Sequence, residues 1–319
     1  MTRPRASLSE RSSHAEWALG SNRTLSDWVL FALLSLLWAS AYAFTRLAVS
    51  KDDPGAGFPP EFIIPARLLG ASLVLLMIAR ASGQAWPPRS DRRSWGLMVI
   101  MGVIGTALPF LAITSAQRTV DSSLAALYVA AAPLFVGLFA HFAFQDDRMT
   151  RQKGGGIIVG FVGVAVLFGP EAVASFGSAS VTAQALCLLA TVFYAISTIT
   201  ARTARSVPPM VFAAGFVTIG AVATLPLLLA VDWPRLAPSS LAIGGVVGLA
   251  IGPTAMASIL YLVLVKRTSA TFLSLTGYTI PIVSAVIGFL AFGEVQTWRA
   301  LLAFALILSG VWLSPRPVG

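Results

Sequence analysis

The sequence predicts an all-α integral membrane protein of ten transmembrane helices, arranged as two inverted five-helix repeats around a central cavity, with both termini in the cytoplasm. Three observations support this fold class: the composition, the distribution of Lys and Arg, and an internal repeat. Of the 319 residues, 56% are hydrophobic and 11% are charged. A soluble domain carries about 25% charged residues, so most of this surface is expected to face lipid.

Ten apolar segments have the length of a membrane span, which needs roughly 20 apolar residues when helical. A polar tail, residues 1–27, precedes them; it lacks the apolar stretch of a secretory signal and is expected to be disordered and cytoplasmic. In chain order the predicted spans are 28–48, 61–81, 94–117, 121–144, 152–169, 181–201, 209–230, 239–265, 270–292 and 298–313.

The positive charges fall mainly on one side of these spans. With the tail placed in the cytoplasm, cytoplasmic segments contain 16 Lys and Arg residues and the opposite segments contain 5. Cytoplasmic loops of membrane proteins are enriched in Lys and Arg, so the count places both termini inside. The positive charges sit in short connectors without a run of five, so nucleic acid is not an expected partner.

The two halves of the chain resemble each other. "WASAYAFTR" from Trp38 matches "YAISTITAR" from Tyr194, and "QRT" at Gln117 matches "KRT" at Lys266. Further matches are "PPEF" at Pro59 with "PPMV" at Pro208, and Asp147, Thr150 and Gly163 with Glu294, Thr297 and Gly310 at an offset of 147. Five spans are an odd number, so the second copy must enter from the opposite face, as in many secondary transporters. The expected domains are 28–169 and 181–313, joined on the outside by residues 169–180.

This arrangement resembles the drug/metabolite transporter superfamily, specifically its ten-span exporters with two EamA-type repeats. The resemblance rests on "WASAYAFTR", "PARLLGA" at Pro65, the "QRT" and "KRT" turns, the mid-span prolines and "GEVQTWRALLAFALILSG" from Gly293. The first half departs from the pattern where it reads "QDDRMTRQKGGG", at the end of span 4. The resemblance implies that spans 1–4 and 6–9 surround the cavity, that spans 5 and 10 are peripheral, and that the protein exports amino acids or other small metabolites.

Several aromatic and hydroxyl side chains are expected inside the spans. Trp38 lies ten residues beyond Trp28, roughly 15 Å deep, while the other tryptophans lie in the tail, in connectors or near span ends. Indole and phenol groups need partners in hydrocarbon, so they are expected to line a cavity or to bond between helices. The predicted substrate-binding residues are Trp38, Tyr42, Arg67, Tyr128, Tyr194, Thr198, Ser274 and Tyr278.

Two prolines occupy matching places in spans 4 and 9. Pro133 and Pro281 are 148 residues apart, and each removes one backbone hydrogen bond from its helix. We interpret them as hinges for movement between outward-open and inward-open forms. Static kinks are the alternative, because transmembrane helices are generally rich in proline.

Charge within the spans is scarce. Arg67, roughly 9 Å into span 2, is expected either to bind a substrate carboxylate or to extend to the interface. No Asp or Glu lies near the middle of a span, which favours facilitated or exchange-type movement and leaves coupling through Asp121 as the alternative.

The motifs of other function classes are missing. There is no HExxH, GxSxG or Walker A sequence, and the two histidines, His14 and His141, do not form a metal site, so neither an enzyme nor a cofactor is expected. An aromatic, largely uncharged lining favours export of aromatic and other hydrophobic neutral amino acids, resembling the aromatic amino acid exporter branch of the family. Cationic drugs, a membrane-embedded enzyme and a non-transporting scaffold remain the alternatives. The composition favours a bacterial inner membrane and leaves the oligomeric state open.

Overall fold

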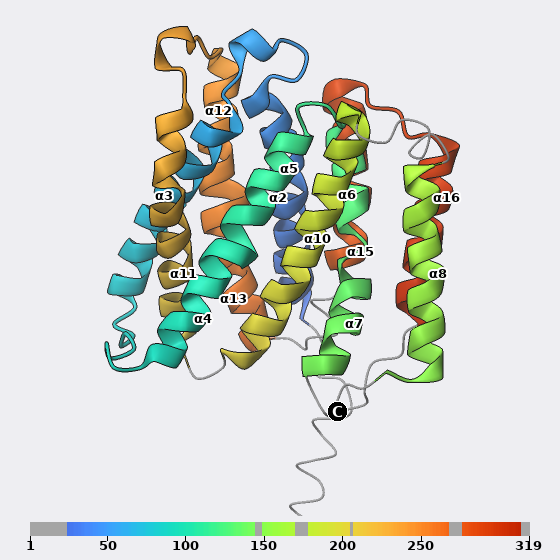
Figure 1. Cartoon of the computed structure of the whole chain (residues 1–319). Coiled ribbons are helices and arrows are strands. Elements are labelled where there is room, and N and C mark those ends of the chain that lie inside the picture. The colour runs from blue at the N-terminus through green and yellow to red at the C-terminus, as the bar shows by residue number, and fades with distance from the viewer. Residues whose placement is uncertain (1–23, 144–148, 170–177, 205–206, 268–275, 314–319) are drawn as a thin grey trace, which may run out of the picture.

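A computed structural model describes residues 24–143, 149–169, 178–204, 207–267 and 276–313. These residues form a bundle of helices that run between two ends of the molecule (Figure 1). In the first half the main helices are α2 (Leu25–Val49), α3 (Pro60–Ala81), α4 (Arg92–Gly102), α5 (Leu108–Ala116), α6 (Ser122–Val129), α7 (Ala132–Ala143) and α8 (Arg151–Phe168). In the second half they are α10 (Ala179–Thr203), α11 (Pro209–Thr224), α12 (Ser240–Leu249), α13 (Ala257–Arg267), α15 (Thr276–Phe292) and α16 (Trp298–Leu313).

Two π-helical segments continue helices that would otherwise be separate. The segment η2 (Val103–Ala107) joins α4 to α5, and η5 (Ala250–Met256) joins α12 to α13. Counting such joined helices together, eight helices of the described residues are long and apolar enough to cross a membrane. Two shorter apolar helices, α15 and α16, follow them. The helix bounds lie within a few residues of the ten predicted spans, apart from the ninth, whose first residues lie outside the described part.

The connections alternate between the two ends. Residues 50–59, 117–121, 231–239 and 293–297 lie at the upper end of the bundle as drawn in Figure 1, and residues 82–91 lie at the lower end. Local signals explain several helix starts. Thr24 and Asp27 form a capping box at the start of α2, and Pro59 and Pro208 directly precede α3 and α11.

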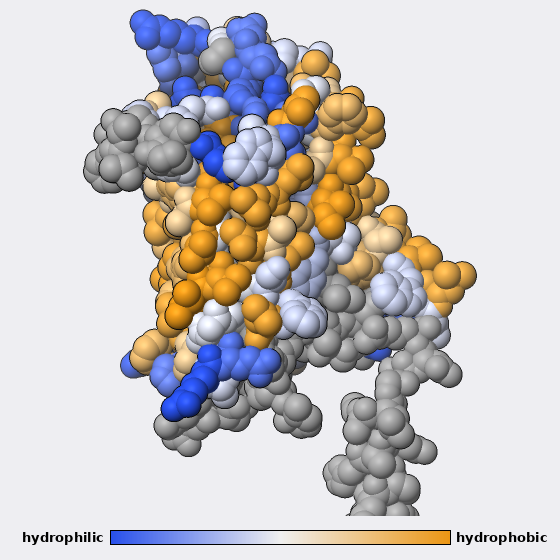
Figure 2. All heavy atoms as spheres, turned by 90° about the vertical axis from the view of Figure 1, so that its right-hand side faces the viewer, coloured by the Kyte–Doolittle hydropathy of each residue, from blue (hydrophilic) through white to orange (hydrophobic). Residues whose placement is uncertain are grey.

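The outer surface of the bundle is apolar over most of its height. Figure 2 shows a broad hydrophobic band between hydrophilic ends. Large apolar side chains of the described helices, such as Leu73, Met77, Ile158 and Leu290, are more than 60% exposed. A surface of this kind is unfavourable in water and suits the hydrocarbon core of a bilayer. The protein is therefore a multi-pass membrane protein.

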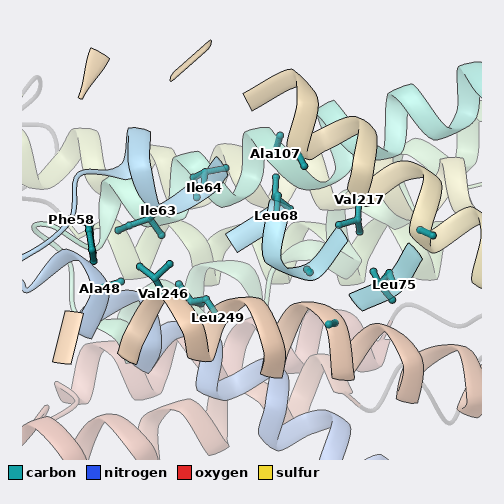
Figure 3. Close-up of a cluster of buried hydrophobic side chains, with 14 of the residues drawn as sticks. Ala48, Phe58, Ile63, Ile64, Leu68, Leu75, Ala107, Val217, Val246 and Leu249 are labelled. Carbon is teal, nitrogen blue, oxygen red and sulfur yellow. The ribbon is translucent and has the colours of Figure 1, made fainter. Parts of the chain in front are cut away.

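The largest buried cluster surrounds α3. Ile63, Ile64 and Leu68 of α3 pack between Val217 of α11 and Leu249 of α12 (Figure 3). This packing holds the middle of α3 in the interior of the bundle. It therefore fixes the position of Arg67, which precedes Leu68.

The helices α8 and α16 form a separate pair at one edge of the bundle (Figure 1). Gly163 and Gly310 allow this pair to approach closely. A Cβ atom at Gly163 would lie 2.8 Å from the carbonyl oxygen of Ala303, and one at Gly310 would lie 2.5 Å from that of Gly156. Small residues at such contacts are the usual way in which helices associate in lipid.

Candidate functional site

Arg67 is a charged side chain in the interior of the bundle. It lies on α3 and is only 5% exposed. Its Nε donates a hydrogen bond to Oγ1 of Thr254 at 2.7 Å, and its Cζ atom lies 3.6 Å from the centre of the Phe110 ring. The guanidinium is thus held by a hydroxyl and by a cation–π contact.

Thr254 is positioned by the π-helical segment η5. Its Oγ1 donates to the carbonyl oxygen of Leu249 at 2.8 Å, five residues earlier, which leaves the oxygen free to accept from Arg67. In the segment η2, Oγ1 of Thr106 donates to Met101 in the same way at 2.9 Å. Such π-helical turns are rare and occur often at functional sites.

Two tyrosines lie near Arg67. Tyr42 of α2 is 7% exposed, Tyr194 of α10 is half-buried, and both lie within electrostatic range of the arginine. Gln117 is fully buried, and its Nε2 donates to the carbonyl oxygen of Tyr42 at 3.0 Å. Its Oε1 has no hydrogen-bond partner among the described residues. The interior near Arg67 is therefore polar on several sides.

Trp38 and Tyr128 lie in other surroundings. The Trp38 ring is half-buried and packs against Tyr261 of α13, with ring centres 5.6 Å apart. Tyr128 is fully buried, donates its hydroxyl to Oε1 of Gln184 and meets the Phe168 ring edge-on at 5.2 Å. Its hydrogen-bonding capacity is met within the protein.

The remaining predicted residues are less enclosed. Thr198 is exposed, and its hydroxyl donates to the carbonyl oxygen of Tyr194 in its own helix at 2.9 Å. Tyr278 is half-buried on α15. Ser274 lies outside the described residues.

The two predicted hinge prolines have different settings. Pro133 follows a break in the span: α6 ends at Val129, and α7 begins at Ala132. Pro281 lies inside the continuous helix α15. Only the first proline accompanies an interrupted helix in the described residues.

A cluster of charged side chains lies at the upper end, and two of them, Arg46 and Glu294, are buried. Arg46, in the last turn of α2, donates to Glu294 at 2.6 Å, to Asp121 at 3.3 Å and to Asp52 at 3.1 Å. Lys51 pairs with Asp121 as well. The side chains of Arg46 and Glu294 are 10% and 2% exposed. The cluster connects α2, the start of α6 and the loop between α15 and α16.

Glu294 also caps helix α6. The backbone N–H groups of Ser122 and Ser123 donate to its carboxylate at 3.0 and 2.9 Å, and both hydroxyls donate as well. Burial disfavours the charged form, but the hydrogen bonds from Ser123 and Ser122 outweigh it and hold the pKa of Glu294 below its ordinary value of 4.5. Gly288 leaves room for this carboxylate, since a Cβ there would clash with Oε2.

The sequence matches the EamA-like transporter family twice, over residues 26–169 and 181–315. The chain belongs to this family. Similar proteins include an uncharacterized transporter of Archaeoglobus fulgidus, 24% identical over 92% of this chain and 99% of the relative. The probable terminal-alkyne amino-acid exporter of Streptantibioticus cattleyicolor is 29% identical over 91% of this chain and 93% of the relative. The uncharacterized inner membrane transporter YedA of Escherichia coli is 25% identical over 91% of this chain and 92% of the relative.

A solved crystal structure shares the fold. It aligns with a TM-score of 0.61 at 23% sequence identity, covering 91% of this chain and 96% of the other. The family and the apolar surface together make this EamA-type protein a membrane transporter. Within the described residues, no group of three or more His, Cys, Asp or Glu side chains could hold a metal ion.

The sequence did not reveal the two side chains that contact Arg67, Thr254 and Phe110, or the buried amide of Gln117, which bonds to the backbone of Tyr42. A signal for Thr254 was available, because "IGPTA" from Ile251 resembles "IGTA" from Ile104 at an offset of 147. Gln117 is part of the "QRT" motif, which marked a turn but not a buried amide.

Proposed function

We propose that this EamA-type protein is a secondary transporter that exports aromatic and other hydrophobic neutral amino acids by alternating access. We place it in a bacterial inner membrane, with ten spans in two inverted repeats, 28–169 and 181–313, and with residues 1–27 and the C-terminus in the cytoplasm. The upper end of the bundle then faces outside. The relative named as an inner membrane transporter supports this location.

Two matched pairs support the inverted repeat. Thr106 and Thr254 make the same hydrogen bond in the two π-helical segments, one in each half. Gly163 and Gly310, matched at an offset of 147, face each other's helices in the α8–α16 pair. Equivalent positions with equivalent local structure are expected of a duplicated unit.

The observation that carries the proposed substrate class is the group formed by Arg67, Tyr42 and Tyr194. An arginine, two phenol groups and nearby aromatic rings inside an apolar bundle offer both polar and apolar contacts to one small molecule. The relative named as a probable amino-acid exporter points in the same direction. We include Trp38, Tyr128, Thr198, Ser274 and Tyr278 in the proposed site.

Transport of phenylalanine by purified protein in liposomes tests this function. Vesicles loaded with unlabelled phenylalanine are expected to accumulate labelled phenylalanine by counterflow, which a scaffold does not support. Trp38→Ala should weaken the apparent affinity about twofold to tenfold, the value of one aromatic contact. Trp312→Ala is the matched control, because Trp312 is 80% exposed near the end of α16. Absence of counterflow for phenylalanine, tryptophan and methionine would overturn the proposal.

The hinge role of the two prolines is tested in the same vesicles. Pro133→Ala and Pro281→Ala are expected to slow exchange more than they change affinity, because alanine favours a continuous, stiffer helix at a place where a hinge would have to bend. Unchanged exchange rates in both variants would remove the hinge from the mechanism.

A further inference from the structure

Arg67 is a buried cation without a counter-ion in the described part of the chain. Its one hydrogen bond there goes to the neutral hydroxyl of Thr254, and its ring contact is with the uncharged Phe110. Salt bridges of the described residues involve other cations, among them Arg46 and Lys51. A charge that is removed from water without an opposite charge is costly, and this cost is not repaid by a hydroxyl and a ring alone.

The outer nitrogens of Arg67 border accessible space. The buried, unpartnered side-chain atoms of the described residues include Nε of Arg46 and Oε1 of Gln117 but neither Nη1 nor Nη2 of Arg67. Since no described residue accepts a hydrogen bond from these two nitrogens, each must retain some accessible surface. Nη1 and Nη2 therefore keep free hydrogen-bonding capacity and a small contact with accessible space, although the residue as a whole is only 5% exposed.

We propose that Arg67 binds the carboxylate of the transported substrate, with Nη1 and Nη2 donating to its two oxygens. This inference rests on the proposed function and narrows it to substrates with a carboxylate. A guanidinium and a carboxylate match in geometry and form paired, charge-assisted hydrogen bonds. The substrate supplies the counter-charge that the described residues lack.

Thr254 and Phe110 act as positioning residues for this group. Thr254 is fixed by its bond to Leu249 and holds the Nε side of the guanidinium. Phe110 covers one face of the plane at 3.6 Å. With one edge and one face occupied, the paired Nη atoms are the part of the guanidinium left to meet a ligand.

The proposed subsite is present once, not twice. The match of Pro59 with Pro208 aligns Arg67 with Phe216 of α11, which packs against Met98 and Val211. The second half therefore has an apolar side chain where the first has a cation. An amino acid has one carboxylate end and one side-chain end, and a site with a single cation suits such an asymmetric molecule.

Competition in the counterflow assay tests the subsite. In the wild type, 3-phenylpropionate, which has the carboxylate but no amine, is expected to compete with labelled phenylalanine. Phenylalaninamide and phenethylamine, which lack the carboxylate, should compete at least tenfold less well. Arg67→Gln is expected to lose about tenfold to a hundredfold of the preference for phenylalanine over its amide, and Arg67→Lys should retain part of it. Arg118→Gln, at an exposed arginine outside the site, is the matched control and should keep the wild-type ratio.

A binding measurement, combined with the transport assay, distinguishes failure of the Arg67 subsite from failure of the proposed transport function. Binding of 3-phenylpropionate to the purified protein, measured by thermal shift, is expected to require Arg67 even if phenylalanine is not transported. Phenylalanine transport with an unchanged amide-to-acid ratio in a folded Arg67→Gln protein would overturn the subsite and leave the transport function intact. Absence of both phenylalanine counterflow and Arg67-dependent 3-phenylpropionate binding would overturn both.

Discussion

Two buried arginines of this protein, Arg46 and Arg67, differ in whether carboxylates contact them. Arg46, at the upper end of α2, contacts three carboxylates, and its nearest partner, Glu294, also caps the start of α6. Arg67, in the interior, contacts one hydroxyl and one ring. Both are almost completely removed from solvent, so the difference lies in their counter-charges and not in their burial.

The comparison indicates what each arginine does. A buried ion pair with good geometry costs little, whereas a buried charge without a partner is retained only where something compensates for it. The Arg46 cluster compensates its charge within the fold, so it is expected to contribute to the stability of the upper end. The described surroundings of Arg67 do not compensate its charge, so it is expected to contribute to binding.

Replacement of each arginine by glutamine should separate these roles most strongly. Arg46→Gln leaves the buried Glu294 without its closest cation, at a cost of about 3–5 kcal/mol of stability. Arg67→Gln removes an uncompensated charge, so stability should be unchanged or slightly higher. Thermal unfolding of the purified proteins in detergent measures both. Equal losses of stability in the two variants would contradict the assignment.

The pH dependence of stability tests whether the charge of Glu294 stabilises the cluster around Arg46. The pKa of Glu294 is below its ordinary value of 4.5 in the folded protein, because hydrogen bonds from Ser122 and Ser123 outweigh its burial. Its ionised form therefore stabilises the fold at a pH above 4.5, and this contribution is lost as the pH falls through the lowered folded value.

Glu294→Gln is the variant that checks this dependence. The difference in unfolding temperature between wild type and Glu294→Gln should be constant near neutral pH and should shrink at a pH below 4.5, as the wild-type carboxyl takes up a proton. A difference that stays the same down to pH 3 would show that the charge of Glu294 does not stabilise the cluster.

Much of the fold could be predicted because apolar length and connector charge act locally along the chain. The predicted spans 209–230 and 298–313 agree with the structure at both ends. Arg67 could be recognised from sequence as a charge within a span. Its partners could not, because the approach of Thr254 and Phe110 depends on how three helices are rotated about their axes.

Two other features could not be predicted from the sequence, for related reasons. Glu294, Asp121 and Arg46 were recognised as charges at or beyond span ends, but their common cluster requires distant connectors to meet in space. Pro133 and Pro281 are equivalent in sequence position, yet in the described part of the chain Pro133 follows a broken helix and Pro281 lies inside α15. Proline removes one hydrogen bond in both cases, and the surrounding packing decides whether the helix continues.

The smallest expected effect concerns Thr254, and the repeat provides its control. Thr254→Val keeps the shape of the side chain but removes the acceptor for Nε of Arg67, so the guanidinium is less firmly oriented. The loss is about 1 kcal/mol, or roughly fivefold in the affinity for 3-phenylpropionate. Thr106→Val removes the same bond to a carbonyl five residues earlier, in the other π-helical segment, where no hydrogen bond to Arg67 is involved. Binding measured by titration of the two purified variants should therefore fall only for Thr254→Val. An equal fall in both would mean that the π-helical segments, and not the contact with Arg67, determine binding.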